Sequence, residues 1–217
     1  MKQCLALFHS GRPGASGHRG ATVSRVRTRP VFLYDLGSPY AWLAAERVNS
    51  MFDPPPEWQP ILLGGLFKLN GRSSWALTEA REEGMAEIER RARDYGLMDV
   101  RWPDPWPGNT LTAMRAASFA KDAGRAVAFS LAAFRQAFCA GRDLTEVDNV
   151  LIAAAACELH PRAVLKGIET RAVKERLRAA TEAAHAAGVP GVPSVVVDGV
   201  VFFGDDRLEE AAAAARS

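Results

Sequence analysis

A serine followed directly by a proline is the first feature of this sequence that could do chemistry. Ser38 and Pro39 come after residues 31–36, a short run with the β-branched and aromatic character of a buried strand. Serine is a preferred N-cap and proline a preferred first helical residue, so the pattern predicts a helix that begins at Pro39. The positive end of a helix and a hydroxyl donor together favour an anion. Ser38 is therefore a candidate anion-stabilising residue, although the same pair also fits a simple helix cap.

Further candidate residues are spread along the chain, and each has a plain structural explanation as well. Val192 and Pro193 stand just before a predicted hairpin. Asp205 and Asp206 open the last predicted helix and could simply cap it. Lys68 lies beside a glycine-rich turn, where a solvated surface position is the alternative. Three tryptophans could wall a site for a flat aromatic compound or could be core residues: Trp75, Trp102 and Trp106.

The cysteines and histidines argue against disulfide and metal chemistry. The cysteines are odd in number, far apart and without a CxxC or CxxH pattern, which indicates a reducing compartment and disfavours structural zinc. They are Cys4, Cys139 and Cys157. The four histidines do not cluster in the sequence, so no metal site is expected.

Charge and hydropathy exclude further classes of protein. The chain has 217 residues and a net charge of +2, but residues 1–30 hold six basic residues and no acidic one. Residues 31–217 are therefore mildly acidic, which disfavours a nucleic-acid platform. No apolar run is long enough for a transmembrane helix, and the run after Met1 is too short for a signal peptide. These observations predict a cytoplasmic protein that contacts neither membrane nor nucleic acid.

The elements that must position the candidates fall into three groups. Residues 1–30 have no hydrophobic period and are expected to be a disordered basic arm, with an organelle transit peptide as the alternative. A strand over residues 31–36, a helix over residues 39–50 and a strand over residues 58–63 open a βαβ unit. Residues 72–168 carry apolar stripes at helical spacing, with Asn109 as an N-cap, and are expected to be all helical.

The last fifty residues return to alternating elements. A helix is expected over residues 172–187, followed by a hairpin over residues 195–203, because Asp198 and Gly199 supply the positive φ angles of a tight turn. A final helix runs to about residue 216. The order βαβ, helical block, αββα resembles a thioredoxin-like α/β fold with a large all-helical insertion. The thioredoxin-like domain would span residues 31–71 and 169–217, and the insertion residues 72–168.

Five motifs in this order carry a closer resemblance. They are Asp35-Leu36-Gly37-Ser38-Pro39-Tyr40, Leu62-Leu63-Gly64-Gly65-Leu66-Phe67-Lys68, Pro107-Gly108-Asn109-Thr110-Leu111 with Arg115, Gly191-Val192-Pro193-Ser194, and Phe203-Gly204-Asp205-Asp206-Arg207-Leu208. Together they resemble the 2-hydroxychromene-2-carboxylate isomerase family, which is related to kappa-class glutathione transferases and to DsbA proteins. The resemblance covers nearly all of residues 31–217.

The resemblance implies a chemistry for Ser38. Redox members of this superfamily carry CxxC at this turn, and a hydroxyl cannot form a disulfide, so thiol oxidoreductase activity by the usual route is excluded. The thiol of glutathione would take the place of the missing cysteine, beside Ser38 and Tyr40. The bond between Val192 and Pro193 would be cis, with the Val192 backbone paired to the peptide of glutathione.

The resemblance also implies partners for the charged ends of glutathione. The segment with Asp205 and Asp206 would meet its ammonium, most naturally through Asp206, and Lys68 would pair with its glycyl carboxylate. One departure concerns Arg72, which stands where relatives have Asn; it could hold a carboxylate bidentately.

Three functions follow as hypotheses. The first is a glutathione-dependent isomerase of an aromatic catabolite, acting as a homodimer, with glutathione as a cofactor. The second is a kappa-class-like glutathione transferase. The third is a non-catalytic thioredoxin-like module that binds peptides at the Val192 edge.

Overall fold

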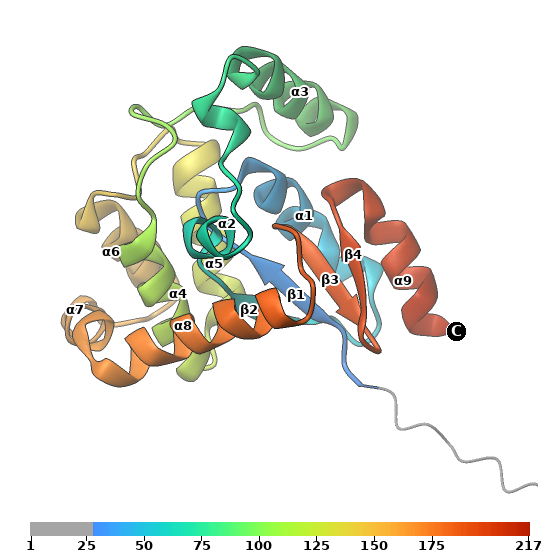
Figure 1. Ribbon diagram of the computed structural model, residues 1–217. Coiled ribbons are helices and arrows are strands. Elements are labelled where there is room, and N and C mark those ends of the chain that lie inside the picture. The colour runs from blue at the N-terminus through green and yellow to red at the C-terminus, as the bar shows by residue number, and fades with distance from the viewer. Residues whose placement is uncertain (1–27) are drawn as a thin grey trace, which may run out of the picture.

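The computed structural model describes residues 28–217 and is built around one four-stranded sheet with the order β2-β1-β3-β4 (Figure 1). The central strand β1 (Val31–Tyr34) pairs in parallel with β2 (Glu57–Pro60) and antiparallel with β3 (Ser194–Val197). At the far edge, β4 (Val200–Phe203) pairs antiparallel with β3. The sheet thus joins the two ends of the described chain, as the expected thioredoxin-like order requires.

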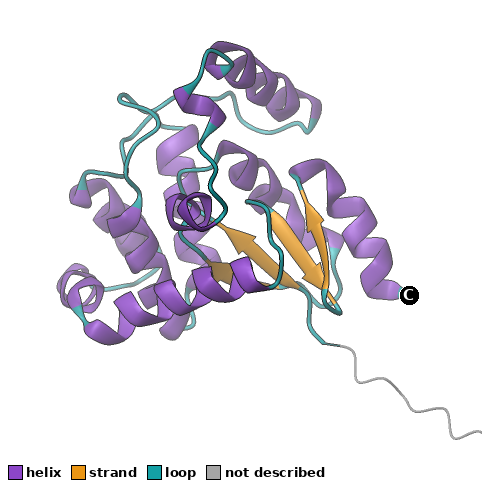
Figure 2. Ribbon diagram, viewed as in Figure 1, coloured by secondary structure: helices purple, strands orange, loops and turns teal. Residues whose placement is uncertain are grey.

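Helices surround this sheet (Figure 2) and form most of the middle of the chain, apart from a loop over residues 95–110. The helix α9 packs against β3, β4 and α1, and α8 packs against β2 and α2. The helices are α1 (Pro39–Met51), α2 (Leu63–Leu69), α3 (Arg81–Asp94), α4 (Leu111–Asp122), α5 (Ala126–Phe138), α6 (Val147–Ala156), α7 (Pro161–Glu169), α8 (Arg171–Ala186) and α9 (Leu208–Arg216). Two short 3₁₀ helices are η1 (Trp75–Leu77) and η2 (Asp205–Arg207). Within residues 28–217, no helix has the length and apolar character that crossing a bilayer requires.

Two expected elements differ from those observed. The second strand ends at Pro60, which has no N–H for the ladder, and α2 begins at Leu63 inside the stretch predicted as strand. The Leu63 amide donates instead to Asp35. The last helix begins at Leu208, because η2 takes up the preceding residues.

The start of the fold also differs from the expectation. Residues 28–30 were predicted to belong to the arm, but Thr28 Oγ1 donates to Asp198 at 2.8 Å and Arg29 Nε donates to the Pro55 carbonyl at 2.7 Å. The Pro30 carbonyl accepts from the Glu57 amide at 2.7 Å. These three residues are therefore part of the folded domain. The rest of the predicted arm, residues 1–27, lies outside the described residues.

The predicted hairpin turn is confirmed. Asp198 has φ 46° and Gly199 has φ 85°, both in the left-handed region that a two-residue turn of this hand requires. The turn sets the register in which Val197 lies opposite Val200 and Ser194 lies opposite Phe203. It therefore positions the segment just before β3, which forms one side of the cleft.

The core below the sheet holds one buried polar pair. Tyr34 packs among Phe32, Trp58 and Phe134, and its hydroxyl lies 2.6 Å from Ser130 Oγ. Neither Tyr34 nor Ser130 is exposed at all. The hydrogen bond thus ties β1 to α5.

We expect Ser130→Ala to lower the free energy of unfolding by about 1–3 kcal/mol, because it leaves the Tyr34 hydroxyl unpaired in the core. Adding Tyr34→Phe removes that unpaired group and should recover part of the loss. Urea unfolding of the two single variants and the double variant tests this. A Ser130→Ala protein less affected than the double variant would contradict it.

Candidate functional site

Ser38 occupies a tight turn between β1 and α1. The Ser38 amide donates to the Asp35 carbonyl at 3.0 Å, and the Gly37 amide donates to Asp35 Oδ1 at 2.8 Å. The Ser38 Oγ accepts from the Ala41 amide at 3.2 Å, so Ser38 is the N-cap of α1, as predicted. Its side chain is only 4% exposed. The hydroxyl is thus held at the positive end of a helix and away from bulk water.

The loop before β3 faces this hydroxyl. The Val192–Pro193 bond is cis, as the resemblance implies. The Ser38 hydroxyl donates to the Val192 carbonyl across 3.5 Å, which is at the long limit of a hydrogen bond. A bond this long is weak, so a ligand acceptor that approaches the hydroxyl from the cleft would compete well for its proton.

Ser38 and Val192 lie in a cleft of about 800 Å³. Its walls come from segments far apart in the sequence: the turn at Ser38, α2 and the residues after it, η1, the loop before α4 and the loop before β3. The charged residues among the described lining are Asp35, Lys68 and Arg72. A volume of this size is in the range of small-molecule sites.

Three aromatic side chains form one wall of the cleft. The centroid of the Trp75 ring lies 6.0 Å from that of Tyr40 and 5.5 Å from that of Trp106. The Trp106 Nε1 donates to the Gly37 carbonyl at 3.4 Å, next to Ser38. Of the three tryptophans named as candidates, Trp75 and Trp106 line the cleft and Trp102 does not. Trp102 packs against Trp106, with 4.6 Å between the ring centroids, and its Nε1 donates to Glu89.

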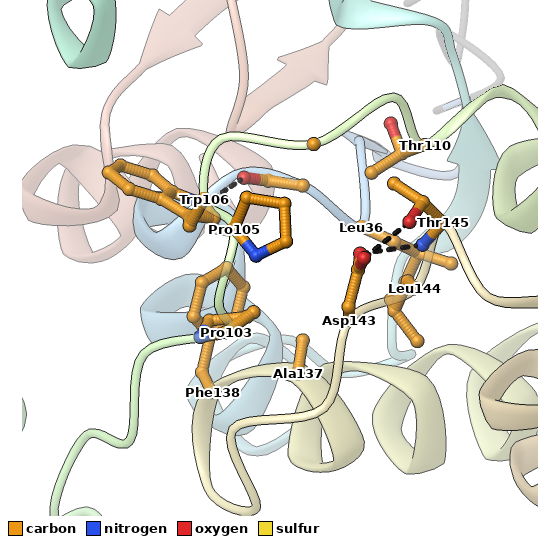
Figure 3. Close-up of a pocket in the computed structure, with 12 residues that line it drawn as sticks. Leu36, Pro103, Pro105, Trp106, Thr110, Ala137, Phe138, Asp143, Leu144 and Thr145 are labelled. Carbon is orange, nitrogen blue, oxygen red and sulfur yellow. Dashed lines mark hydrogen bonds between the residues drawn. The ribbon is translucent and has the colours of Figure 1, made fainter.

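The loop behind Trp106 is tightly packed. Pro103, Pro105, Trp106 and Phe138 line one small cavity (Figure 3), and the Trp106 indole is hydrogen-bonded at one edge. The cavity left there is about 20 Å³, enough for about one water molecule. Asp143 accepts from the amide and hydroxyl of Thr145 on the far side of this cavity (Figure 3). Trp106 is therefore a wall with little room to move.

Two cations also line the cleft. Lys68 is in the last turn of α2, and Arg72 follows this helix; both side chains are exposed. Arg72 Nη1 donates to the Pro190 carbonyl at 3.5 Å. Within residues 28–217, neither cation forms an ion pair. Both are therefore available to an anionic ligand.

The structure does not place the acidic pair before α9 in the lining of the cleft. Asp205 is 1% exposed, and its carboxylate accepts from Arg91 Nη1 and from the Tyr95 hydroxyl, each at 2.9 Å. Asp206 has a side chain 60% exposed and lies 3.8 Å from Arg91. Asp205 is thus bound by Arg91 of α3 and by Tyr95 at the end of this helix, a pairing that sequence spacing could not reveal. Asp206 stays accessible to solvent.

Asp35 is a site residue that the sequence reasoning did not single out. Its carboxylate accepts from Gly37 N, from Thr110 Oγ1 at 2.9 Å and from Leu63 N at 2.7 Å. Burial raises the pKa of Asp35 above its ordinary value, and the three hydrogen bonds oppose that shift. An acidic residue inside an otherwise apolar strand pattern was the signal for it, since such a group needs dedicated partners.

With this geometry, the comparisons with known proteins identify the family. The sequence model of the DSBA-like thioredoxin domain matches residues 31–215. The chain belongs to this family. It is also 28% identical to human glutathione S-transferase kappa 1 over 84% of this chain and 88% of the human protein. The rat glutathione S-transferase kappa 1 is 28% identical over 81% of this chain and 85% of its own.

Solved structures confirm the DsbA-like thioredoxin fold. The 2-hydroxychromene-2-carboxylate isomerase structure has a TM-score of 0.76 at 19% identity, covering 86% of this chain and 94% of its own. A probable DsbA oxidoreductase from Streptomyces coelicolor has a TM-score of 0.71 at 20% identity, covering 87% and 89%. These identities are low, so the two structures are evidence for the fold alone.

The described cysteines do not supply the thiol that the turn lacks. Cys139 and Cys157 lie at the C-terminal ends of α5 and α6, and neither lines the cleft. Burial, with the nearby Glu46 carboxylate, raises the pKa of Cys139 to about 11. Burial also raises the pKa of Cys157. Among residues 28–217, no group of three or more metal-ligating side chains could hold an ion.

We expect Cys139 to react slowly with a thiol reagent. In a Cys4→Ser/Cys157→Ser background, its raised pKa leaves little thiolate, and alkylation at neutral pH should be roughly 100-fold slower than that of free cysteine. Mass spectrometry of iodoacetamide labelling over time measures the rate. Adding urea is the control, since unfolding should restore the ordinary rate; fast labelling of the folded protein would contradict the burial of this thiol.

Proposed function

We propose that the protein is a glutathione-dependent enzyme that binds the thiol of glutathione against Ser38. The observation that carries this proposal is the buried Ser38 hydroxyl at the N-terminus of α1, which lines the cleft and is within 3.5 Å of the Val192 carbonyl. In this family's redox members a cysteine occupies such a turn. A serine keeps the field of the helix and a hydrogen-bond donor but cannot form a disulfide.

The residues of the cleft fit glutathione in several respects. Its thiol would lie at Ser38 beside Tyr40, and its peptide backbone would pair with Val192 in the manner of an added strand. Its carboxylates are matched by two cations without ion-pair partners among residues 28–217, Lys68 and Arg72. Arg72 would thus take over a contact made by Asn in the resemblance.

The ammonium of glutathione has one candidate partner. Asp206 remains the proposed carboxylate for it, because its side chain is mostly exposed. Asp205 cannot serve in the same way while Arg91 and Tyr95 occupy its carboxylate. Its proposed role is therefore indirect, through its bond to α3.

The chemistry of the site follows from its charges. Bound glutathione would supply a thiolate that adds reversibly to an electrophilic carbon. Ser38 and the N-terminus of α1 would lower the thiol pKa from roughly 8.5 toward neutrality, each unit being about 1.4 kcal/mol. Trp75 and Trp106 would hold a flat substrate against this position and keep water from it.

The first candidate reaction is isomerisation of an aromatic catabolite of the 2-hydroxychromene-2-carboxylate type, in which glutathione is not consumed. The aromatic wall of the cleft supports a planar substrate. The expected homodimer and cytoplasmic location belong to this proposal.

The second candidate is a transferase, favoured by the 28% identity to the human and rat kappa-class transferases. It needs the same site without release of the thiol from the product. Measuring whether reduced glutathione is consumed in proportion to product separates the two reactions.

We expect Ser38→Ala to lower the glutathione-dependent rate by roughly 10- to 1000-fold, because it removes a preorganised donor to the thiolate. Glutathione affinity, measured by isothermal titration, should change far less, since most contacts lie at Val192 and the cations. The ultraviolet absorbance of the bound thiolate should fall at neutral pH.

Thr170→Ala is the matched control for the lost helix cap. Thr170 caps α8 in the same way, with its Oγ1 accepting from the Val173 amide at 3.3 Å, and it does not line the cleft. Each variant loses about 0.5–2 kcal/mol of capping. Full activity of Ser38→Ala would show that Ser38 serves only as a helix cap. If the native protein does not bind glutathione, the non-catalytic peptide-binding module is the hypothesis that remains.

A further inference from the structure

The ring of Trp75 rests directly on a glycine of α3. A Cβ added at Gly84 would lie 2.2 Å from Trp75 Cζ3, 2.5 Å from Cε3 and 2.8 Å from Cη2. No such contact exists in real proteins, so any side chain at position 84 must displace the ring. Gly84 is inside a helix, where glycine is less favourable than alanine by about 1 kcal/mol. The Trp75 ring fills the space that a side chain at position 84 would need, which explains why a glycine stands there.

Trp75 is also a shared wall of two cavities. The cleft with Ser38 lies on one side of it, and a groove of about 500 Å³ along α3 lies on the other. Tyr40 and Trp75 line both, and Gly84 lines only the groove. The indole therefore lies between α3 and the cleft, and a push from Gly84 moves it into the cleft.

The helix α3 that carries Gly84 is held by apolar packing and by an ion pair. Ile88 and Ala92 on α3 are buried in the core. Arg91 on this helix is hydrogen-bonded to Asp205 and lies 5.6 Å above the ring of Tyr40. In Figure 1, α3 stands at the outer edge of the molecule above α1, with which it packs. These contacts dock the helix on which the Trp75 ring rests.

We infer that Gly84 is a positioning residue that sets, through Trp75, how large a group can occupy the cleft beside the bound thiol. The inference rests on the proposed function and extends it to the class of substrate, a planar aromatic electrophile that lies in the cleft against Trp75 and Trp106. The wall borders the reacting position because Trp106 is bonded to Gly37 and Tyr40 is two residues after Ser38.

The test compares two glutathione derivatives of different size. Isothermal titration of S-methylglutathione and S-(4-nitrobenzyl)glutathione gives a ratio of dissociation constants for each variant. In Gly84→Ala, the displaced indole should weaken binding of the nitrobenzyl derivative by about tenfold, or about 1.4 kcal/mol, relative to the methyl derivative. In a Trp75→Leu background, Gly84→Ala should leave the ratio within about twofold, because no ring remains to be displaced.

Gly167→Ala is the matched control. Gly167 is a helical glycine of α7 whose added Cβ would lie 2.2 Å from Phe119 Cδ2, and neither residue lines the cleft. It should lower the melting temperature without changing the ratio. An unchanged ratio in Gly84→Ala, or an equal change in Gly167→Ala, overturns the inference.

Two further outcomes remain decisive. If Gly84→Ala alone does not fold, recovery of folding on adding Trp75→Leu supports the inferred contact between Trp75 and Gly84. Failure to recover overturns it. If the native protein binds neither derivative, the proposed function is wrong, and 8-anilinonaphthalene-1-sulfonate then probes the cleft. Gly84→Ala should weaken binding of this dye relative to the native protein, and it should have no such effect in the Trp75→Leu background. If Gly84→Ala and the native protein bind the dye equally, the inference is overturned.

Discussion

The carboxylate of Asp35 joins three segments from which the cleft is built. It accepts hydrogen bonds from the turn of Ser38, from the first residue of α2 and from the residue before α4, at Gly37, Leu63 and Thr110. Burial disfavours its charge, and no cation among residues 28–217 pairs with it. The three donated hydrogen bonds therefore offset the cost of burying the Asp35 carboxylate. The position of each segment is thus coupled to the positions of the other two. Ser38 faces Val192 only because this turn is held in one conformation.

The site keeps the electrostatics of its fold family while changing the reactive atom. The N-terminus of α1 still favours an anion, and Ser38 adds a donor with a long and replaceable bond. In the proposed function the reacting thiol comes with the ligand, which the cations Lys68 and Arg72 and the Val192 edge would hold.

The two tryptophans of the aromatic wall are held in place by different contacts. Trp106 is fixed by its own tightly packed, proline-rich loop, whereas Trp75 depends on where α3 is docked. The docking uses Asp205, a residue that the family resemblance alone assigned to ligand binding. Asp205 thus contributes to docking the helix on which Trp75 rests, although it does not line the cleft itself.

The features that could be predicted from the sequence are those that depend on neighbours in the chain. They include the Ser38 cap, the Asp198–Gly199 turn and the helical stripes, because caps, turns and periodicity act within a few residues. Folding alone brings Asp205 to Arg91, Trp102 to Trp106 and Trp75 to Gly84. These outcomes depend on how separate helices meet, and hydrophobic patterns do not encode which polar or aromatic side chains then become neighbours.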